Sequence, residues 1–421
     1  MFKNSDIVCA IEFGTSKITV LIGAADADRN VEIIGRGCVQ SRGIIKGEIT
    51  DAKQAESALQ SALEKTESDC GELSNCKMVS VLVTGCGIES MHGCGSTVVK
   101  NDQRKVTYDD IFDAEENASI VNLSPEREII NRSPLYYQLD DRKVINPENM
   151  PGMRLDAHVH LVHGISSRIA NFTSIVRNCG FDSSIIEVIF SPLAAITGVV
   201  SSSEKDDGIL LVDMGMGCTD FAVESDDGVS ASGVLQIGFD HVANDLAIGL
   251  ELPIDFCRKL LESGELSRAR SKNQDTISFP GGLGNVRQIP LTSFETIIDY
   301  RLRETFEIVR EMLENAKVQF NFQTVAITGG AALFPRTQEL LGEIFQSRCQ
   351  KRFPADIHGA VTNLDNPRFS AVWGALKYAA VCLDRNGTGR TNAIDRLVNG
   401  INRLFDNSRD GLRNIGKSIK F

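Results

Sequence analysis

The sequence lacks the features that mark several classes of protein. No two of its 11 cysteines have Cys-x-x-Cys spacing, and their number is odd, which argues against a zinc ribbon or a disulfide framework and predicts reduced thiols. No apolar run approaches the ~20 residues of a membrane-spanning helix, and the first residues lack the pattern of a signal peptide. These absences predict a protein that is made in the cytoplasm and stays there.

Positive charge is scarce as well. The chain carries 44 Lys and Arg against 56 Asp and Glu, which gives a net charge of −12. Nonspecific binding of nucleic acid by the whole body is therefore not expected. A length of 421 residues, 42% of them hydrophobic, predicts two or more domains with sizeable cores.

Two similar glycine turns lie far apart in the chain. One apolar strand ends in Asp213 and the turn Met214–Gly217, and an earlier one ends in Glu12 and the turn Gly14–Lys17. Glycines let backbone amides approach an anion closely, and a carboxylate at a strand end can hold the water shell of Mg²⁺. Two such hairpins facing each other predict a clamp for phosphate groups.

A third glycine motif follows the predicted strand Thr324–Thr328. Gly329, Gly330 and Ala331 separate this strand from a helix. Junctions of this kind, at the carboxyl edge of a sheet, are where ligands bind in α/β proteins. The motif predicts a further wall of the same site.

Hydrophobic periodicity predicts an α/β chain with an insertion. The pattern up to Val83 predicts one half-domain, in which 31–34 and 38–40 form a pair of short strands. Polar and charged residues dominate from about 84 to 163, which predicts a small inserted subdomain. Its last strand carries His158, His160 and His163; without carboxylate or thiol company we expect them at a surface rather than around a metal.

A long helix is predicted in the second half. The pattern Thr292-x-x-Glu295 predicts a capping box at its start. Apolar residues recur at helical spacing from Phe294 to Phe320, which predicts a helix buried along one stripe.

The tail after about residue 385 differs from the rest of the chain. Its apolar residues recur at helical spacing: Ile394, Leu397, Val398, Ile401, Leu404, Phe405, Leu412, Ile415 and Ile419. Residues 394–421 carry a charge of +3, which leaves −15 for the remainder. A basic amphipathic helix beyond a glycine-rich linker is typical of an anchor to an anionic membrane surface. The alternative is a terminal helix that docks on its own protein or on a partner.

The ordered set of motifs resembles the actin/Hsp70/sugar-kinase superfamily and, within it, the FtsA family of actin-like bacterial cell-division proteins. The resemblance covers essentially the whole chain. It rests on Ile11–Lys17, Ser41–Gly43 with Lys46-Gly47, Asp213–Asp220, Ile327–Ala332, the predicted helix Ser370–Tyr378 and the amphipathic tail.

The resemblance implies an actin-like ATPase fold of two half-domains around a nucleotide cleft. It places 1–83 and 164–206 in the first half-domain, 84–163 in the FtsA-type insertion, and 207–251 and 324–384 in the second half-domain. A further subdomain would span 252–323, and 385–421 would be linker and membrane-targeting helix.

The resemblance also implies roles for residues. ATP phosphates would be held by Gly14, Thr15, Ser16, Lys17, Gly215, Gly217 and Thr219; Mg²⁺ by Glu12 and Asp213; adenosine by Gly329, Gly330 and Ala331, with Gly238 closing the site. The protein would polymerise into filaments on the cytoplasmic face of the membrane at the division site. It would bind the acidic C-terminal peptide of FtsZ through Arg301 and Arg303, with Arg287 as a further candidate.

Several positions depart from the family pattern. Met216 replaces a glycine and Cys218 a threonine in the second phosphate turn, which weakens amide or hydroxyl contact with phosphate. Cys257 and Leu260 stand where relatives tend to have Glu and Lys near the nucleotide, and Ser191 stands where the ATP-hydrolysing chaperones have Glu. These departures predict nucleotide binding with slow or absent hydrolysis.

Rival functions within the superfamily make different demands. A small-molecule kinase needs a catalytic carboxylate beside the γ-phosphate, and we can assign none; it also leaves the tail without a role. A chaperone needs a peptide-binding module beyond the chain's end, and the rod-shape proteins lack this type of insertion. An actin-like adaptor of pilus assembly carries the insertion but typically lacks the amphipathic tail, and it is the main alternative.

Overall fold

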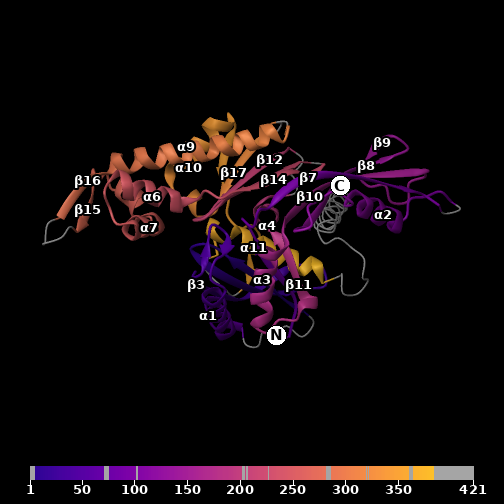
Figure 1. Cartoon of the computed structure of the whole chain (residues 1–421), viewed down its shortest axis with the longest axis horizontal. Helices are drawn as coiled ribbons and strands as arrows, with labels where there is room; N and C mark the ends of the chain where they lie inside the picture. Colours follow the sequence, from indigo (N-terminus) through magenta and orange to yellow (C-terminus); the bar gives the residue numbers. More distant parts are fainter. Residues whose placement is uncertain are drawn as a thin grey trace, which may run out of the picture.

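A computed structural model describes residues 5–383, except 71–74, 101–102, 202–203, 205–206, 226, 281–285, 319, 321 and 360–363. The predicted linker and membrane helix, residues 385–421, lie outside the described residues. Within the described part, two large sheets, an inserted sheet and their helices form one body with two arms (Figure 1).

The first large sheet forms the lower body in Figure 1 and has the order β11-β6-β1-β2-β3-β19. Its strands are β1 (Asp6–Phe13), β2 (Lys17–Ala25), β3 (Val31–Gln40), β6 (Cys76–Val83), β11 (Ile186–Phe190) and β19 (His358–Gly359). The first three strands are antiparallel, whereas β1, β6 and β11 run parallel. The helices α1 (Ala52–Cys70), α3 (Ser166–Asn178) and α4 (Ser191–Val199) complete this half. The parallel strands end at the same edge, beside the turn between β1 and β2.

Strand β3 is continuous, so the prediction of two short strands at 31–34 and 38–40 was wrong. Gly35 and Gly37 interrupt its apolar pattern, which looked like a turn. Instead, α1 packs so closely that a Cβ at residue 37 would lie 1.9 Å from the carbonyl oxygen of Ala62. The glycine serves a close helix contact.

The second large sheet has the order β14-β13-β12-β17-β18. Its strands are β12 (Ile209–Met214), β13 (Thr219–Ser225), β14 (Gly228–Leu235), β17 (Thr324–Thr328) and β18 (Arg348–Lys351). It packs with α6 (Phe239–Gly249), α9 (Leu291–Asn315) and α10 (Pro335–Phe345). The helices α7 (Ile254–Ser263) and α8 (Glu265–Ser271) and the hairpin β15 (Thr276–Pro280) and β16 (Val286–Pro290) extend as the left arm in Figure 1. Strands β12 and β17 run parallel, so the glycine motifs that follow them lie at the same edge of the sheet.

Helix α9 buries the predicted apolar stripe but differs at both ends. No side chain caps its start, and Glu295 pairs with Arg270 (2.5 Å) rather than with Thr292. The capping-box prediction was therefore wrong. The helix ends at Asn315, and Phe320 lies beyond it with 42% of its surface exposed.

The insertion forms the right arm, a sheet of order β7-β10-β8-β9 (Figure 1). Its elements are β7 (Glu89–Val98), α2 (Tyr108–Ala118), β8 (Arg127–Leu139), β9 (Arg142–Val144) and β10 (Arg154–Ile165). Helix α2 begins with a genuine capping box, because Thr107 accepts a bond from the Asp110 amide and Asp110 accepts one from the Thr107 amide.

The inserted sheet also contacts the second half through its histidines. His160 is 1% exposed with Nε2 2.8 Å from Ser232 Oγ on β14, and His92 Nε2 lies 2.8 Å from the Ser230 carbonyl. His163 is buried and accepts a bond from Arg127 Nε (2.9 Å). The prediction of surface histidines was wrong for His160 and His163, because packing within the sheet and against β14 covers them.

The end of the described chain returns to the first half. Strand β19 pairs with β3, and α11 (Ser370–Cys382) packs on α4 and β1. A Cβ at Gly374 would lie 1.7 Å from the Ala194 carbonyl oxygen, so these helices touch through backbone. The predicted grouping of 324–384 with the second half therefore does not hold for its last part.

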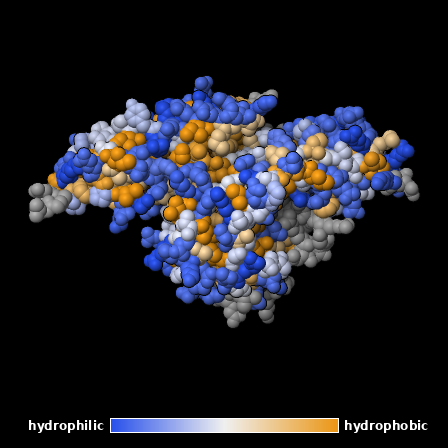
Figure 2. All heavy atoms as spheres, viewed as in Figure 1, coloured by the Kyte–Doolittle hydropathy of each residue, from blue (hydrophilic) through white to orange (hydrophobic). Residues whose placement is uncertain are grey.

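The surface shown in Figure 2 is mostly hydrophilic, and small groups of hydrophobic residues are visible on both arms and on the lower body. Within the described residues, no helix is both long and apolar enough to cross a membrane.

Candidate functional site

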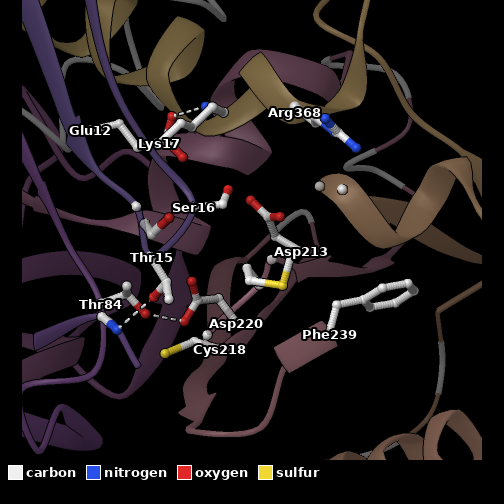
Figure 3. A pocket seen from close by; sticks show the side chains of 18 of the residues that line it. Glu12, Thr15, Ser16, Lys17, Thr84, Asp213, Cys218, Asp220, Phe239 and Arg368 are labelled. Carbon is white, nitrogen blue, oxygen red and sulfur yellow. Dashed lines mark hydrogen bonds and ion pairs between the residues drawn. The ribbon is translucent and has the colours of Figure 1, made fainter. Parts of the chain in front are cut away.

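The three predicted glycine motifs meet in one pocket between the two large sheets. The pocket encloses about 980 Å³ of space that is continuous with solvent. It is lined by the β1–β2 turn, the end of β6, the β12–β13 turn, the end of α7 and the residues after β17 (Figure 3). Every residue predicted to hold phosphate, metal or adenosine lines it, apart from Thr219 and Gly238.

The first turn holds a lysine at the pocket wall. The Gly14 amide donates to the Lys17 carbonyl (3.0 Å), which closes the turn. Lys17 Nζ lies 2.6 Å from Glu12 Oε2 and 2.8 Å from Thr19 Oγ1, and 4.9 Å from the centre of the Phe369 ring. These contacts hold the ammonium group of Lys17 beside the turn, at the wall of the pocket.

The second turn packs directly against the first. The Gly215 amide donates to the Cys218 carbonyl (2.9 Å). A Cβ at residue 217 would lie 2.1 Å from Thr15 Oγ1, and that hydroxyl accepts a bond from the Gly47 amide (3.2 Å). Only glycine at 217 lets the two turns approach so closely.

Carboxylates gather where the turns meet. Asp213 and Asp220 are directly opposite on β12 and β13, and Asp220 accepts a hydrogen bond from Thr84 Oγ1. Burial and, less strongly, the charge of Glu12 raise the pKa of Asp213 to about 7, although the charge of Lys17 opposes them. Burial likewise raises the pKa of Asp220 well above its usual value. Acids held together in this way favour a cation.

The donor set fits Mg²⁺ held largely through water. Mg²⁺ prefers oxygen ligands and keeps several waters, usually bound by one or two carboxylates plus phosphates. Glu12, Asp213 and Asp220 supply the oxygens. The described residues contain no group of three His, Cys, Asp or Glu placed to coordinate an ion directly.

The third motif packs against Asp213 and is hydrogen-bonded to the turn before α11. Gly329 has φ of +79°, and a Cβ there would lie 2.2 Å from Asp213 Oδ1. Its amide donates to the Pro367 carbonyl (3.2 Å). Gly330 and Ala331 line the pocket beside it, which leaves bare backbone for a flat ligand.

Two predicted residues lie outside the pocket. Thr219 is fully buried and its hydroxyl donates to the Ile237 carbonyl (2.7 Å). Gly238 precedes α6, where a Cβ would lie 2.5 Å from the Met216 carbonyl oxygen. Both support the second turn from behind rather than facing a ligand.

Other lining residues were missed from the sequence. Asp220 belonged to the predicted run Asp213–Asp220, and its hairpin position opposite Asp213 was a usable signal. Thr84 follows a strand end, where ligands bind. Leu261 and Glu262 reach the pocket from α7, whereas Cys257 and Leu260 point into the core. The expected substitution at those two positions therefore does not touch the pocket.

The arginines proposed for partner binding have intramolecular partners. Arg301 donates twice to Asp245 (2.5 and 3.0 Å) and once to Glu304 (2.6 Å). Arg303 pairs with Glu343 (2.8 Å), and Arg287 donates to the Glu251 carbonyl (3.4 Å). An acidic peptide would have to compete with these carboxylates.

Two family models match the chain. Residues 85–163 match the SHS2 domain inserted in FtsA, and residues 210–374 match the cell division protein FtsA. The first match covers nearly the whole predicted insertion, and the second contains two of the three glycine motifs.

Curated relatives match along most of their length. The chain is 29% identical over 394 residues to the cell division protein FtsA of Neisseria meningitidis, covering 92% of this chain and 93% of the relative. It is 27% identical over 382 residues to the FtsA of Borreliella burgdorferi, covering 89% and 91%.

Solved structures share the fold at low identity. The PilM–PilN type IV pilus biogenesis complex gives a TM-score of 0.62 at 13% identity, covering 89% of this chain and 98% of that one. MreB5 of Spiroplasma citri bound to ADP gives 0.54 at 11% identity, covering 91% and 99%. These likenesses show an actin-like ATPase fold.

Proposed function

The chain belongs to the FtsA family of actin-like proteins, and from this premise we propose that it binds ATP with Mg²⁺, polymerises on the cytoplasmic face of the membrane at the division site, and tethers FtsZ filaments there. The observation that carries the nucleotide part is the convergence of three glycine motifs and three carboxylates on one pocket.

In this proposal the two turns divide the phosphates between them. The turns Gly14–Lys17 and Gly215–Gly217 line the pocket from opposite halves, and Lys17 adds a charge-assisted donor. Bound Mg²⁺ would neutralise phosphate charge beside Asp213, Glu12 and Asp220. Binding then joins the two halves, because each supplies one turn.

We propose that turnover is slow or absent. General-base catalysis needs a carboxylate or histidine placed toward an attacking water. Ser191 lines the pocket at the start of α4 where a glutamate would be needed, and Asp220 is bonded to Thr84. The pocket suits a nucleotide used to organise the protein rather than one rapidly consumed.

The partner and membrane parts rest on other regions. The basic amphipathic tail would bind anionic lipid, because residues 394–421 carry a charge of +3 whereas the rest of the chain is net negative. The FtsZ peptide would bind the exposed side of α9, where Arg301 and Arg303 would exchange Asp245 and Glu343 for peptide carboxylates.

Co-sedimentation with anionic liposomes tests the proposal. The full chain and a truncation after Arg390 are each mixed with liposomes, with and without ATP and Mg²⁺, and examined by electron microscopy. We expect only the full chain to pellet and to form filaments on lipid. Soluble behaviour of both versions, with phosphate transfer to a small-molecule acceptor, would instead assign the chain to the kinases.

A further inference from the structure

Arg368 is a positively charged residue that lines the pocket. It has no role in the phosphate and metal binding proposed above. It lies in the 3₁₀ turn Pro367–Phe369 and is partly exposed. Figure 3 shows its side chain on the opposite side of the pocket from Thr15 and Thr84. Leu261, Glu262 and Gly330 surround this end, where a nucleoside would lie if the phosphates occupy the turns.

The turn that carries Arg368 is bonded to the glycine pair. The Pro367 carbonyl accepts from the Gly329 amide and from Thr328 Oγ1, both at 3.2 Å. Asn366 Oδ1 accepts from the Arg368 amide (3.0 Å). The arginine and the bare backbone of the glycines are therefore positioned as one unit.

The guanidinium keeps most of its donors available. Its Nη2 donates to the Glu262 carbonyl at the end of α7 (3.1 Å), and within the described residues no carboxylate pairs with it. Nε lies 3.7 Å from where a Cβ of Gly330 would be. This bond holds the guanidinium beside the pocket, which Arg368 lines.

We propose that Arg368 binds the purine base of the nucleotide by stacking its guanidinium on the ring. The inference rests on the proposed nucleotide binding and assigns the end of the pocket that recognises the base. Guanidinium planes stack on aromatic rings, whereas an ammonium acts as a point charge. A Cβ on Gly330 would meet nothing nearer than Arg368 Nε at 3.7 Å, so this glycine leaves room for the ring beside the guanidinium.

Calorimetric titration of the full chain with Mg²⁺-ATP and Mg²⁺-ADP tests this assignment. Arg368→Met and Arg368→Lys should each weaken both nucleotides by the same factor, about ten-fold, the usual size of a stacking contact. Arg258→Met, on α7 but paired with Asp240 outside the pocket, is the matched control and should leave both affinities unchanged. Melting temperatures without ligand report any loss of the α7 bond.

Each other outcome overturns the assignment in a distinguishable way. A larger loss for ATP than for ADP would place Arg368 on the phosphates. Recovery by lysine would show a point-charge contact, and unchanged affinity with a lowered melting temperature would show a cap for α7 alone. If the unmodified chain binds neither nucleotide, the proposed function fails together with this assignment.

Discussion

Gly329 and Gly330 are neighbours in sequence but occupy opposite situations. Gly329 has φ of +79° and ψ of −175° and faces Asp213, a backbone conformation that is almost confined to glycine. Gly330 has no neighbour closer to a built Cβ than Arg368 Nε at 3.7 Å.

Gly329→Ala should therefore destabilise the protein by about 1–3 kcal/mol through backbone strain and abolish nucleotide binding, because the new methyl displaces Asp213. Gly330→Ala should leave stability within about 0.5 kcal/mol. Urea denaturation and titration with Mg²⁺-ATP measure the two effects. Equal stability of both variants would contradict the strained geometry.

At this scale the sequence predicted residue types better than directions. Glycines and acids at strand ends mark a phosphate site because few other residues permit close backbone approach. Whether Thr219 faces a ligand depends on which side of a hairpin it occupies. Whether Cys257 and Leu260 reach the pocket depends on how α7 is rotated about its axis, and all three residues are buried. Arg368 carried no local signal, since its place follows from tertiary packing.

Two helix starts give a matched test of capping. Thr107 forms a full capping box with Asp110 at α2, whereas Thr292 caps nothing at α9. Thr107→Ala should cost about 1 kcal/mol of stability, and Thr292→Ala less than about 0.5 kcal/mol. Chemical denaturation compares them; a larger cost at 292 would show that the predicted box forms after all.

The contact between the inserted sheet and β14 should be sensitive to acid. Burial and, less strongly, the neighbouring His92 lower the pKa of His160 from 6.5 to about 3. The folded state therefore binds fewer protons than the unfolded state. The contribution of neutral His160 to the free energy of unfolding is therefore complete above pH 6.5 and is lost as the pH falls towards 3. The loss is at most about 3 kcal/mol at pH 4.

His160→Gln can keep a bond to Ser232 and cannot titrate, so it should flatten this pH dependence. His158→Gln is the control, because His158 is less buried and stacks on Tyr136. Melting temperatures from pH 7.5 to 4 for both variants provide the measurement. An unchanged pH profile in His160→Gln would mean that another group controls acid stability.

Helices and strands were predicted well where the apolar pattern is long. They were predicted poorly where tertiary contacts determine their ends. The apolar stripe predicted the position of α9, but the start of the helix depends on Pro290 and on the ion pair of Glu295 with Arg270. The glycines of β3 looked like a break because nothing local shows that α1 lies over them.

For the whole molecule, the tail should decide where the protein resides. Leu404→Asp with Phe405→Asp places two charges in the apolar stripe and should release the full chain from anionic liposomes. Asn399→Asp with Asn402→Asp adds the same charge outside the stripe and should retain most binding. Undiminished binding of the first variant would contradict a membrane helix.

The order of motifs predicted two halves and an insertion, but it assigned the last helix to the wrong half. Chain order suggested the second, because α11 follows its strands. The backbone contact of Gly374 with Ala194 and the burial of Trp373 place it in the first core. Such a crossing is set by packing between distant residues, which local patterns do not encode.

That crossing has a consequence for synthesis. The first half lacks an edge strand and a central core helix until β19 and α11 have emerged from the ribosome. The N-terminal strands therefore cannot complete their sheet and core until the entire second half has been translated. During that time the side of α4 that α11 covers remains exposed. Trp373, the chain's single tryptophan, is buried in that late contact with its Nε1 bonded to Ala355, so its fluorescence would time the completion of a domain begun at residue 6.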